Sequence, residues 1–311
     1  MEYLWKQKPK TSQPAIDQLS KEINVNLTLA NMLINRGVES FEQAKSYFRP
    51  SLTSLHDPFL MKDMTEAVER IQVAIASEQK IMVYGDYDVD GTTAVALMYG
   101  FLKTFYPDVV FYIPDRYKEG YGISEKGVRF AAENEIKLII ALDCGIKAIE
   151  KVALATELGV DFIICDHHTP GDELPAAVAV LDSKRSDCNY PYKELSGAGV
   201  GFKLIQAIAI RRGMDSALLD AYLDLVAVSI AADIVPITGE NRILAYYGLD
   251  RLNNTPRPGL KALMLSSNLE KDIGISDVVF KIGPRINASG RLEHAKASVE
   301  LLISSDLEGA M

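Results

Sequence analysis

From Ile81 onward, short apolar runs alternate with segments of helical periodicity, and this alternation limits the folds open to the chain. A short apolar run fits a strand buried on both faces, and each segment between two runs is long enough for a helix. The runs are residues 81–84, 109–113, 138–142, 161–165 and 178–181, with helical segments at 92–105, 124–134 and 146–158. A strand–helix–strand order predicts an α/β fold, a parallel sheet with helices on both faces.

We expect the chain to have three parts. Residues 1–75 carry polar helical patterns and form a helical amino-terminal extension, and residues 76–255 form the α/β domain. Pro256, Pro258 and Gly259 mark a boundary, after which residues 256–311 complete the core and begin a connecting helix. Because Ser305–Glu308 resembles a capped helix start, we expect this to be the amino-terminal piece of a longer protein.

The composition excludes several classes of protein. The 311 residues include 33 basic and 42 acidic side chains, a net charge of −9, which argues against a surface that coats nucleic acid with general positive charge. Three cysteines without CxxC spacing are typical of a reduced, cytoplasmic protein. The first residues lack the apolar stretch of a signal peptide, and no apolar segment is long enough to span a bilayer, so we expect no membrane partner.

Three aspartates, Asp86, Asp88 and Asp90, follow the first apolar run at alternate positions. Carboxylates this close repel one another unless a proton or a cation compensates, and a hard divalent ion is the simplest partner. Helix capping explains one aspartate, not three. A calcium loop of the EF-hand type needs Glu at its twelfth position, where Leu97 stands. A haloacid-dehalogenase phosphatase shares the signature of Asp88–Thr92, but there the nucleophilic aspartate closes the strand directly.

A second cluster, Asp166, His167 and His168, follows the run at 161–165. Two adjacent histidines with an aspartate at a strand end are a sharper signal than a lone histidine, which is usually structural. One imidazole among several carboxylates favours manganese or magnesium. The neighbouring histidine faces another direction and is available as a phosphate contact or general acid.

Asp143 and Asp233 are two further candidates. Asp143 closes the run at 138–142 and, beside the other acidic strand ends, is interpreted as a bridging metal ligand in preference to a helix cap. Asp233 ends an apolar helical run. Its position fits two interpretations equally well, a ligand that completes the metal site and a cap of the next helix. Several carboxylates with a histidine suggest two metal ions about 3.5–4 Å apart, which activate water for in-line displacement at phosphorus.

Six stretches in this order resemble the DHH phosphoesterases and, within them, the RecJ-like exonucleases: VYGDYDVDGTTA, ALDCGI, CDHHTPGDELP, SGAGVGFKL, AADIVP and KIGPRINASGRL. The resemblance implies a DHH catalytic domain with two manganese or magnesium ions held by Asp86, Asp88, Asp90, Asp143, His167 and Asp233. It implies that Asp143 bridges the ions, that His168 contacts the scissile phosphate, and that Asp166 orients the histidines. It leaves open which of the first three aspartates binds directly and which acts through water.

By this resemblance the chain is expected to hydrolyse single-stranded DNA from the 5′ end, in recombination and repair. Arg116, in a loop with Lys118 and two tyrosines, is a candidate for the cationic and stacking contacts that hold single strands, with an ordinary surface turn as the alternative. Candidates for phosphate contacts are Arg285, Asn287, Ser289 and Arg291. Further candidate partners are a single-strand-binding protein and a helicase. The DHH-associated and oligonucleotide-binding domains of the family have no counterpart before Met311.

Two other functions stay open. The first is a DHH phosphodiesterase for short oligonucleotides or cyclic dinucleotides, or a pyrophosphatase, which the GPRINASGR stretch and the long amino-terminal extension disfavour. The second is a non-catalytic replication-fork scaffold, a class that typically loses metal ligands, whereas this chain keeps them. The glycine-rich stretch Gly197–Gly201 is interpreted as close helix packing in preference to nucleotide binding.

Overall fold

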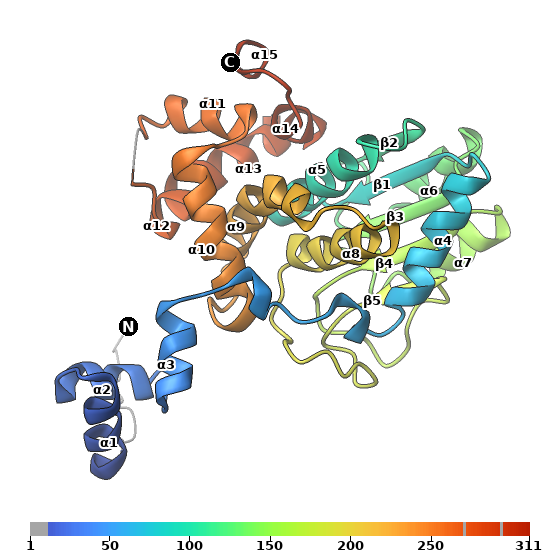
Figure 1. Ribbon diagram of the computed structural model, residues 1–311. Helices are drawn as coiled ribbons and strands as arrows, with labels where there is room; N and C mark the ends of the chain where they lie inside the picture. The colour runs from blue at the N-terminus through green and yellow to red at the C-terminus, as the bar shows by residue number, and fades with distance from the viewer. Residues whose placement is uncertain (1–11, 270–271, 293–294) are drawn as a thin grey trace, which may run out of the picture. The chain divides into compact units, whose positions relative to one another are not determined.

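The computed structural model describes residues 12–269, 272–292 and 295–311, without the side chains of residues 289–292 and 295. The chain divides into two compact units, one ending at Ser54 and the other beginning at Leu55 (Figure 1). None of the helices in the described ranges is long and apolar enough to cross a membrane.

The first unit is a small helical bundle, which confirms the helical amino-terminal segment. It contains α1 (Gln13–Ile23), α2 (Leu27–Ile34), α3 (Phe41–Phe48) and the 3₁₀ turn η1 (Leu52–Ser54). Asn26 and Ser40 cap α2 and α3, and the buried residues Leu19, Ala30 and Ala44 lie in its core. The limits at 75 and 255 remain a prediction, and the second unit already includes the helix at residues 64–76.

The second unit is built on a five-stranded parallel sheet, which confirms the predicted α/β fold. The strands are β1 (Ile81–Gly85), β2 (Val109–Tyr112), β3 (Leu138–Leu142), β4 (Asp161–Cys165) and β5 (Ala179–Leu181), in the order β2-β1-β3-β4-β5. Ile81 pairs with Val109 on one side and with Leu138 on the other, and Leu138 pairs with Asp161. The strands are therefore in phase, and their carboxyl ends meet along one edge.

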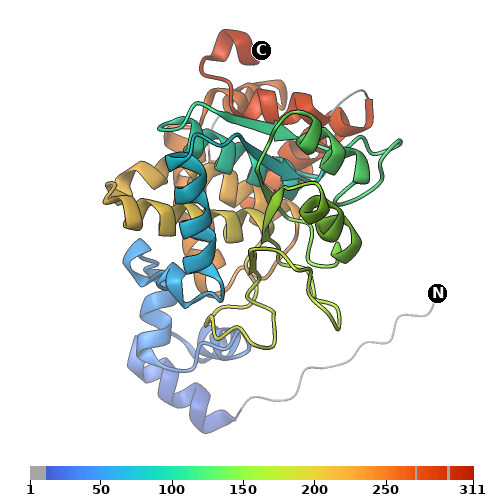
Figure 2. The ribbon, with the colours of Figure 1, turned by 90° about the vertical axis from the view of Figure 1, so that its right-hand side faces the viewer.

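Helices cover both faces of this sheet. In chain order the helices described in the second unit are α4 (Met64–Ala76), α5 (Val89–Lys103), α6 (Glu125–Glu133), α7 (Ile149–Glu157), α8 (Gly197–Arg212), α9 (Leu223–Ala232), α10 (Gly239–Asn254), α11 (Pro258–Ser266), α12 (Ile275–Asp277), α13 (Gly283–Leu292), α14 (Ala295–Leu302) and α15 (Leu307–Ala310). Shorter turns are the 3₁₀ turns η2 (Pro58–Leu60) and η3 (Ser216–Tyr222) and the π-helical turn η4 (Val278–Ile282). In Figure 2, α4 and α8 lie on one side of the sheet, and α6 and α7 lie on the other.

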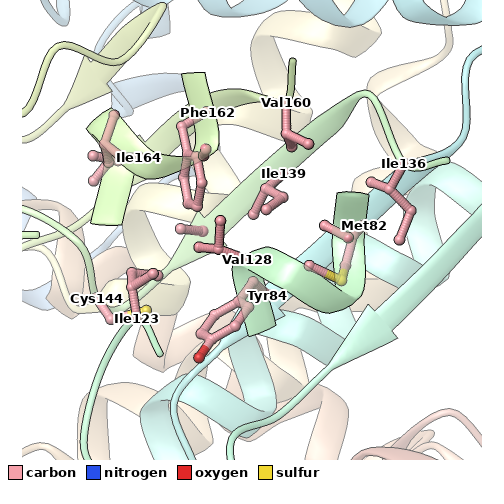
Figure 3. Close-up of a cluster of buried hydrophobic side chains, with 14 of the residues drawn as sticks. Met82, Tyr84, Ile123, Val128, Ile136, Ile139, Cys144, Val160, Phe162 and Ile164 are labelled. Atoms are coloured by element: carbon pink, nitrogen blue, oxygen red, sulfur yellow. The ribbon is translucent and has the colours of Figure 1, made fainter. Parts of the chain in front are cut away.

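The core between the sheet and the pair α6 and α7 follows the two-residue period of the strands (Figure 3). Met82 and Tyr84 of β1 and Phe162 of β4 point into it, against Val128 of α6, and all are at most 1% exposed. Burying one such apolar side chain stabilises the fold by about 1.5–3 kcal/mol. The Tyr84 hydroxyl also donates to the carbonyl of Gly122 at 3.0 Å, which fixes the loop after β2 beside the sheet.

The strand order determines where a site can form. After β1 the chain continues to β2 at one edge of the sheet and then crosses back to β3, on the other side of β1. After β3 it continues to β4, away from β1. The connections that leave the neighbouring strands β1 and β3 therefore run in opposite directions along the sheet. In such sheets a crevice opens outside the carboxyl ends of the strands at this switch point. The residues after β1 and after β3 therefore lie side by side.

Candidate metal centre

Three carboxylates converge on one imidazole nitrogen at the carboxyl edge of the sheet. Nε2 of His167 lies 3.1 Å from Oδ1 of Asp143, 3.6 Å from Oδ2 of Asp233 and 3.7 Å from Oδ2 of Asp90. Asp143 follows β3 and His167 follows β4, while Asp90 comes from the first turn of α5 and Asp233 from the end of α9. The structure thus brings together four residues that are 143 positions apart at the extremes, 90 and 233.

Asp143 is the most deeply buried of these acids, with 1% of its surface exposed. Its N–H donates to the carbonyl of Cys165 at 2.9 Å, which ties the end of β3 to the end of β4. Its backbone is left-handed, with φ at 58°, a conformation that costs a non-glycine residue roughly 1 kcal/mol or more. Burial, followed by repulsion from Asp90 and Asp88, raises the pKa of Asp143 well above its ordinary value.

Asp90 is held by three donors. Its Oδ2 accepts from the N–H of Gly197 at 2.7 Å, and its Oδ1 accepts from the N–H of Ala198 at 2.8 Å and from the Ser229 hydroxyl at 2.7 Å. Gly197 and Ala198 begin α8, and the free N–H groups of a helix N-terminus favour a negative charge. The carboxylate is therefore fixed in place although it is only 3% exposed.

Asp86 and Asp88 have local partners as well. Asp86 accepts from the N–H of Tyr87 at 2.7 Å and from that of Gly122 at 2.8 Å, so it holds the loop after β2 against the turn after β1. Burial, partly offset by these bonds, raises the pKa of Asp86 to about 7. Asp88 caps α5 by accepting from the N–H of Gly91 at 2.9 Å, and burial raises its pKa above the ordinary value. Capping thus applies to one of the three aspartates, in agreement with the sequence pattern.

His168 is oriented by Asp166. Oδ1 of Asp166 lies 2.8 Å from Nδ1 of His168 and also accepts from the backbone N–H groups of His167 and His168. Oδ2 accepts from the backbone N–H of Ile146 at 2.9 Å. Burial opposes the ionised form of Asp166, but the bonds from His168 and Ile146 outweigh it and hold the pKa of Asp166 below its ordinary value. The bond to Asp166 raises the pKa of His168, whose side chain is 44% exposed.

Asp233 follows the last residue of α9 and is the most exposed of the three acids around His167, with 33% of its side chain exposed. Burial and the charge of Asp90 raise its pKa to about 6. The next residue, Ile234, has a left-handed backbone with φ at 59°, which is strained for a β-branched side chain. The chain therefore turns sharply where Asp233 faces the imidazole.

The residues present fit divalent metal ions. Ligand atoms of Asp143, His167 and His168 lie within 4.8 Å of one another, as do those of Asp90, His167 and Asp233. Oδ1 of Asp143 and both ring nitrogens of His167 are buried without a hydrogen-bond partner among the described residues, since the 3.1 Å approach is not aligned for a hydrogen bond. Buried polar atoms without partners and like charges in contact are both relieved by a cation, and carboxylate and imidazole donors suit manganese and magnesium.

The chain is similar to known proteins of one family. Residues 80–230 match the DHH family, N-terminal domain. The chain is 43% identical to the single-stranded-DNA-specific exonuclease RecJ of Bacillus subtilis over 300 residues, covering 96% of this chain and 37% of that protein. It matches the crystal structure of RecJ in complex with Mn2+ from Thermus thermophilus with a TM-score of 0.82 and 30% identity, over 96% of this chain and 42% of that one. This chain contains a RecJ-type DHH core.

The RecJ-type core spans half or less of the length of the curated relatives named here. RecJ of Escherichia coli is 34% identical over 291 residues, which are 90% of this chain and 50% of that protein. A structure of exonuclease RecJ bound to manganese has a TM-score of 0.75 and 34% identity, over 84% of this chain and 64% of that chain.

The predicted substrate residues of the RecJ-type core lie in two places. The guanidinium of Arg116 lies 5.0 Å from the ring centre of Tyr87, Tyr87 meets Tyr121 edge-on at 5.7 Å, and Tyr121 meets His168 edge-on at 6.4 Å. These contacts join Arg116 to the metal centre. Arg285 is exposed on α13, and its guanidinium donates to the carbonyls of Lys281 and Ser266.

The other three candidates are on the same helix. Asn287 is exposed. The side chains of Ser289 and Arg291 lie outside the described part of the structure, so their predicted contacts stay predictions.

The sequence did not reveal the positioning role of three residues of the RecJ-type core, Ser196, Gly197 and Ser229. Ser229 donates to Asp90, and its oxygen lies 2.6 Å from that of Ser196, which caps α8. A Cβ added to Gly197 would lie 2.6 Å from the Cβ of Asp143, so only glycine fits there. Gly201 packs within 3.2 Å of Leu142, measured from an added Cβ, as expected for close packing, but the glycine-rich stretch also binds Asp90. A serine before glycines was the available signal for a helix N-terminus facing the site.

Proposed function

We propose that this core is the catalytic part of a metal-dependent exonuclease that removes nucleotides from the 5′ end of single-stranded DNA in recombination and repair. The observation that carries the proposal is the convergence of Asp90, Asp143 and Asp233 on Nε2 of His167. The relatives named single-stranded-DNA-specific exonuclease support the substrate class. RecJ structures in complex with Mn2+ and with Mg2+ support the choice of metal.

Two manganese or magnesium ions are proposed, held by Asp88, Asp90, Asp143, His167 and Asp233, with Asp143 shared between them. When bound, the ions supply an activated water and neutralise the charge that develops on the phosphate oxygens. Asp86 was counted among the ligands from the sequence. It stays a proposed ligand beside these five, because each of its oxygens accepts one backbone N–H group, as those of Asp90 also do, and keeps a lone pair for an ion. The bond from Gly122 also holds the loop after β2.

The reaction is hydrolysis of one phosphodiester bond. A water oxygen forms a bond to phosphorus, the bond from phosphorus to the 3′-oxygen breaks, and that oxygen takes up a proton as the terminal nucleotide leaves. His168 is proposed to contact the scissile phosphate through Nε2, because Asp166 holds Nδ1 and fixes the ring. Because the Nδ1–H group donates a hydrogen bond to Asp166, Nε2 is the ring nitrogen that faces the substrate.

The strand is proposed to reach the centre along Arg116, Tyr87 and Tyr121. The guanidinium over a tyrosine ring and the edge-on rings form a cationic and aromatic surface of the kind that binds unpaired bases. Arg285, Asn287, Ser289 and Arg291 are proposed as further phosphate contacts. A cytoplasmic location and two partners, a single-strand-binding protein and a helicase, belong to the same proposal, because the relatives are named as specific for single-stranded DNA.

The test is release of label from a long single strand carrying a 5′ label, with manganese, beside an Asp143→Ala control. We expect labelled mononucleotide from the native chain only, and slower hydrolysis of a dinucleotide than of the long strand. Preferred hydrolysis of the dinucleotide would identify a short-oligonucleotide phosphodiesterase instead. Tight binding of the strand without cleavage in either metal would favour a scaffold and overturn the proposal.

A further inference from the structure

A cavity of about 420 Å³ opens beside His168 on the side of α7. Its walls are the loop at Tyr121–Ile123, the turn from Cys144 to Ala148, the side of Lys151, and Asp166 with His168. This volume falls in the range of about 300–1,000 Å³ that is usual for small-molecule sites. The cavity shares His168 with the metal centre, but no residue of its α7 side belongs to the ligand set.

The inner wall of this cavity is apolar. Ile123, Cys144 and Ile146 line it and are 9%, 3% and 2% exposed, and Figure 3 shows Ile123 beside Cys144 at the margin of the core. Tyr121, about half exposed, stands at the mouth edge-on to His168. An apolar slot with an aromatic ring at its mouth suits a flat, uncharged ring system such as a nucleobase.

The outer rim, in contrast, carries two cations. Lys147 precedes α7 and Lys151 lies in its first turn, and both side chains line the cavity. Among the described residues, neither forms an ion pair within 4.0 Å, and Glu125, the acid whose pKa Lys151 helps to lower, is hydrogen-bonded to Arg129. The amino end of α7 also has no side-chain cap. This rim therefore offers positive charge in a chain whose net charge is −9.

We propose that this cavity binds a deoxynucleoside 5′-monophosphate, the product of the proposed exonuclease, with the base against the apolar wall and the phosphate at Lys147 and Lys151. The inference rests on the proposed function for the identity of the nucleotide, but not for the site itself. In this arrangement the base lies against the apolar wall, the sugar lies at the mouth beside His168, and the phosphate lies at the cationic rim. The terminal nucleotide thus has its own subsite while the rest of the strand lies outside the cavity.

The test uses the native chain in buffer with EDTA, so that binding is measured apart from catalysis. Titration calorimetry compares deoxyadenosine 5′-monophosphate with deoxyadenosine and with inorganic phosphate. The variant Lys147→Gln/Lys151→Gln keeps most of the length of both side chains and removes their charge. Lys137→Gln is the matched control, because Lys137 is exposed at the amino end of β3, the opposite edge of the sheet.

We expect the double variant to bind the monophosphate at least about tenfold more weakly, as expected for loss of charge-assisted hydrogen bonds, and to bind deoxyadenosine as the native chain does. The control should bind both like the native chain. Equal affinity of the double variant and the native chain for the monophosphate would overturn the proposal, and so would absence of monophosphate binding to the native chain.

Kinetics separate this subsite from the proposed activity. The monophosphate should inhibit strand hydrolysis by the native chain competitively, at concentrations at least about tenfold lower than for the double variant. Binding that depends on the two lysines without any strand cleavage would support the subsite and contradict the nuclease. Strand cleavage that the monophosphate inhibits equally in the native chain and in the double variant would support the nuclease and contradict the subsite.

Discussion

The second unit contains two buried clusters of charged residues that solve the problem of burial in opposite ways. In the first, Nζ of Lys203 donates to the carbonyl of His56 at 2.6 Å and lies 3.2 Å from Glu240, which also accepts from the Tyr190 hydroxyl at 2.7 Å. Lys203 and Glu240 are at most 1% exposed, and opposite charges and hydrogen bonds compensate each other. In the second, Asp90, Asp143 and Asp233 have the same charge and share one imidazole.

This difference separates a cluster that holds the fold together from one that is built for a ligand. A buried ion pair with its hydrogen bonds made is complete, and removing one partner leaves the other as an uncompensated charge. A group of buried carboxylates is incomplete by itself, and part of its repulsion is relieved by taking up protons, as the raised pKa values of Asp143 and Asp233 show. Four measurements test this distinction.

The largest effect is expected from Asp143→Ala. Loss of the shared ligand should lower strand cleavage by at least about a thousandfold, because metal ions contribute several kcal/mol to such reactions. The same change should leave the free energy of unfolding in EDTA unchanged or higher, since it removes a buried charge repelled by its neighbours. Circular dichroism melts with and without manganese measure the second effect, and severe destabilisation in EDTA would contradict the functional interpretation of Asp143.

Lys203→Met should give the opposite result. It leaves Glu240 buried without a cation, which typically costs about 3–5 kcal/mol of folding free energy. Denaturant unfolding in EDTA measures this loss. Manganese affinity of the folded variant should stay at the native value, because Lys203 has no contact with the carboxylates around His167. A variant of native stability would show that this cluster does not hold the fold together.

Metal should also change the dependence of stability on pH. In EDTA, Asp86 with a pKa of about 7 and Asp233 with a pKa of about 6 bind protons more tightly in the folded than in the unfolded chain, where the ordinary value is 3.8. Their contribution to stability is therefore lost as pH rises from about 4 through 7. His168, whose pKa is raised, acts in the same direction, whereas Asp166, whose pKa is lowered, matters only below its ordinary value.

The measurement is the free energy of unfolding between pH 5 and 7.5, in EDTA and in magnesium. We expect a fall with rising pH in EDTA and a gain of about 2.7 kcal/mol near neutral pH when magnesium is a hundredfold above its dissociation constant. Asp143→Ala should lose most of this gain. Stability that rises with pH in EDTA would contradict the repulsion described for the metal centre.

The smallest effect is expected from Ser229→Ala. It removes one of the three donors to Asp90, so manganese affinity should change by about 1 kcal/mol, the net value of one hydrogen bond. Ser298→Ala is the control, because Ser298 is also buried and donates to the carbonyl of Ile286. An equal change of metal affinity in both variants would show that Ser229 acts through general stability and not by positioning Asp90.

Much of the fold was predictable from local sequence. The five strands lie within one residue of the apolar runs, and α6 differs from its predicted limits by one residue at either end, because burial on both faces and helical periodicity are local properties. The helix predicted from 92 begins at Val89, since the aspartate at 88 caps it and Asp90 enters its first turn. The helix predicted from 146 begins at Ile149 after the turn at Gly145, whose φ is +112°.

The metal centre was predictable as a set of residue types, but not as a set of contacts. Asp143, His167 and Asp233 were recognised from their positions after apolar runs, and the structure brings them together. The direction of Asp86 toward Gly122 was not predictable, because it depends on a hydrogen bond between residues 36 positions apart. The same holds for Ser229, which meets Asp90 across 139 positions.

Local sequence is enough to place the strands and the acidic residues that follow them, and therefore to indicate the kind of ion that these residues can bind. Packing decides instead that β1 lies beside β3, that the N-terminus of α8 meets Asp90, and that a cavity with two lysines opens beside His168. The physical reason is that apolar periodicity and capping act between near neighbours in the chain. Strand order and the partners of a buried carboxylate depend on packing between segments that are far apart in sequence.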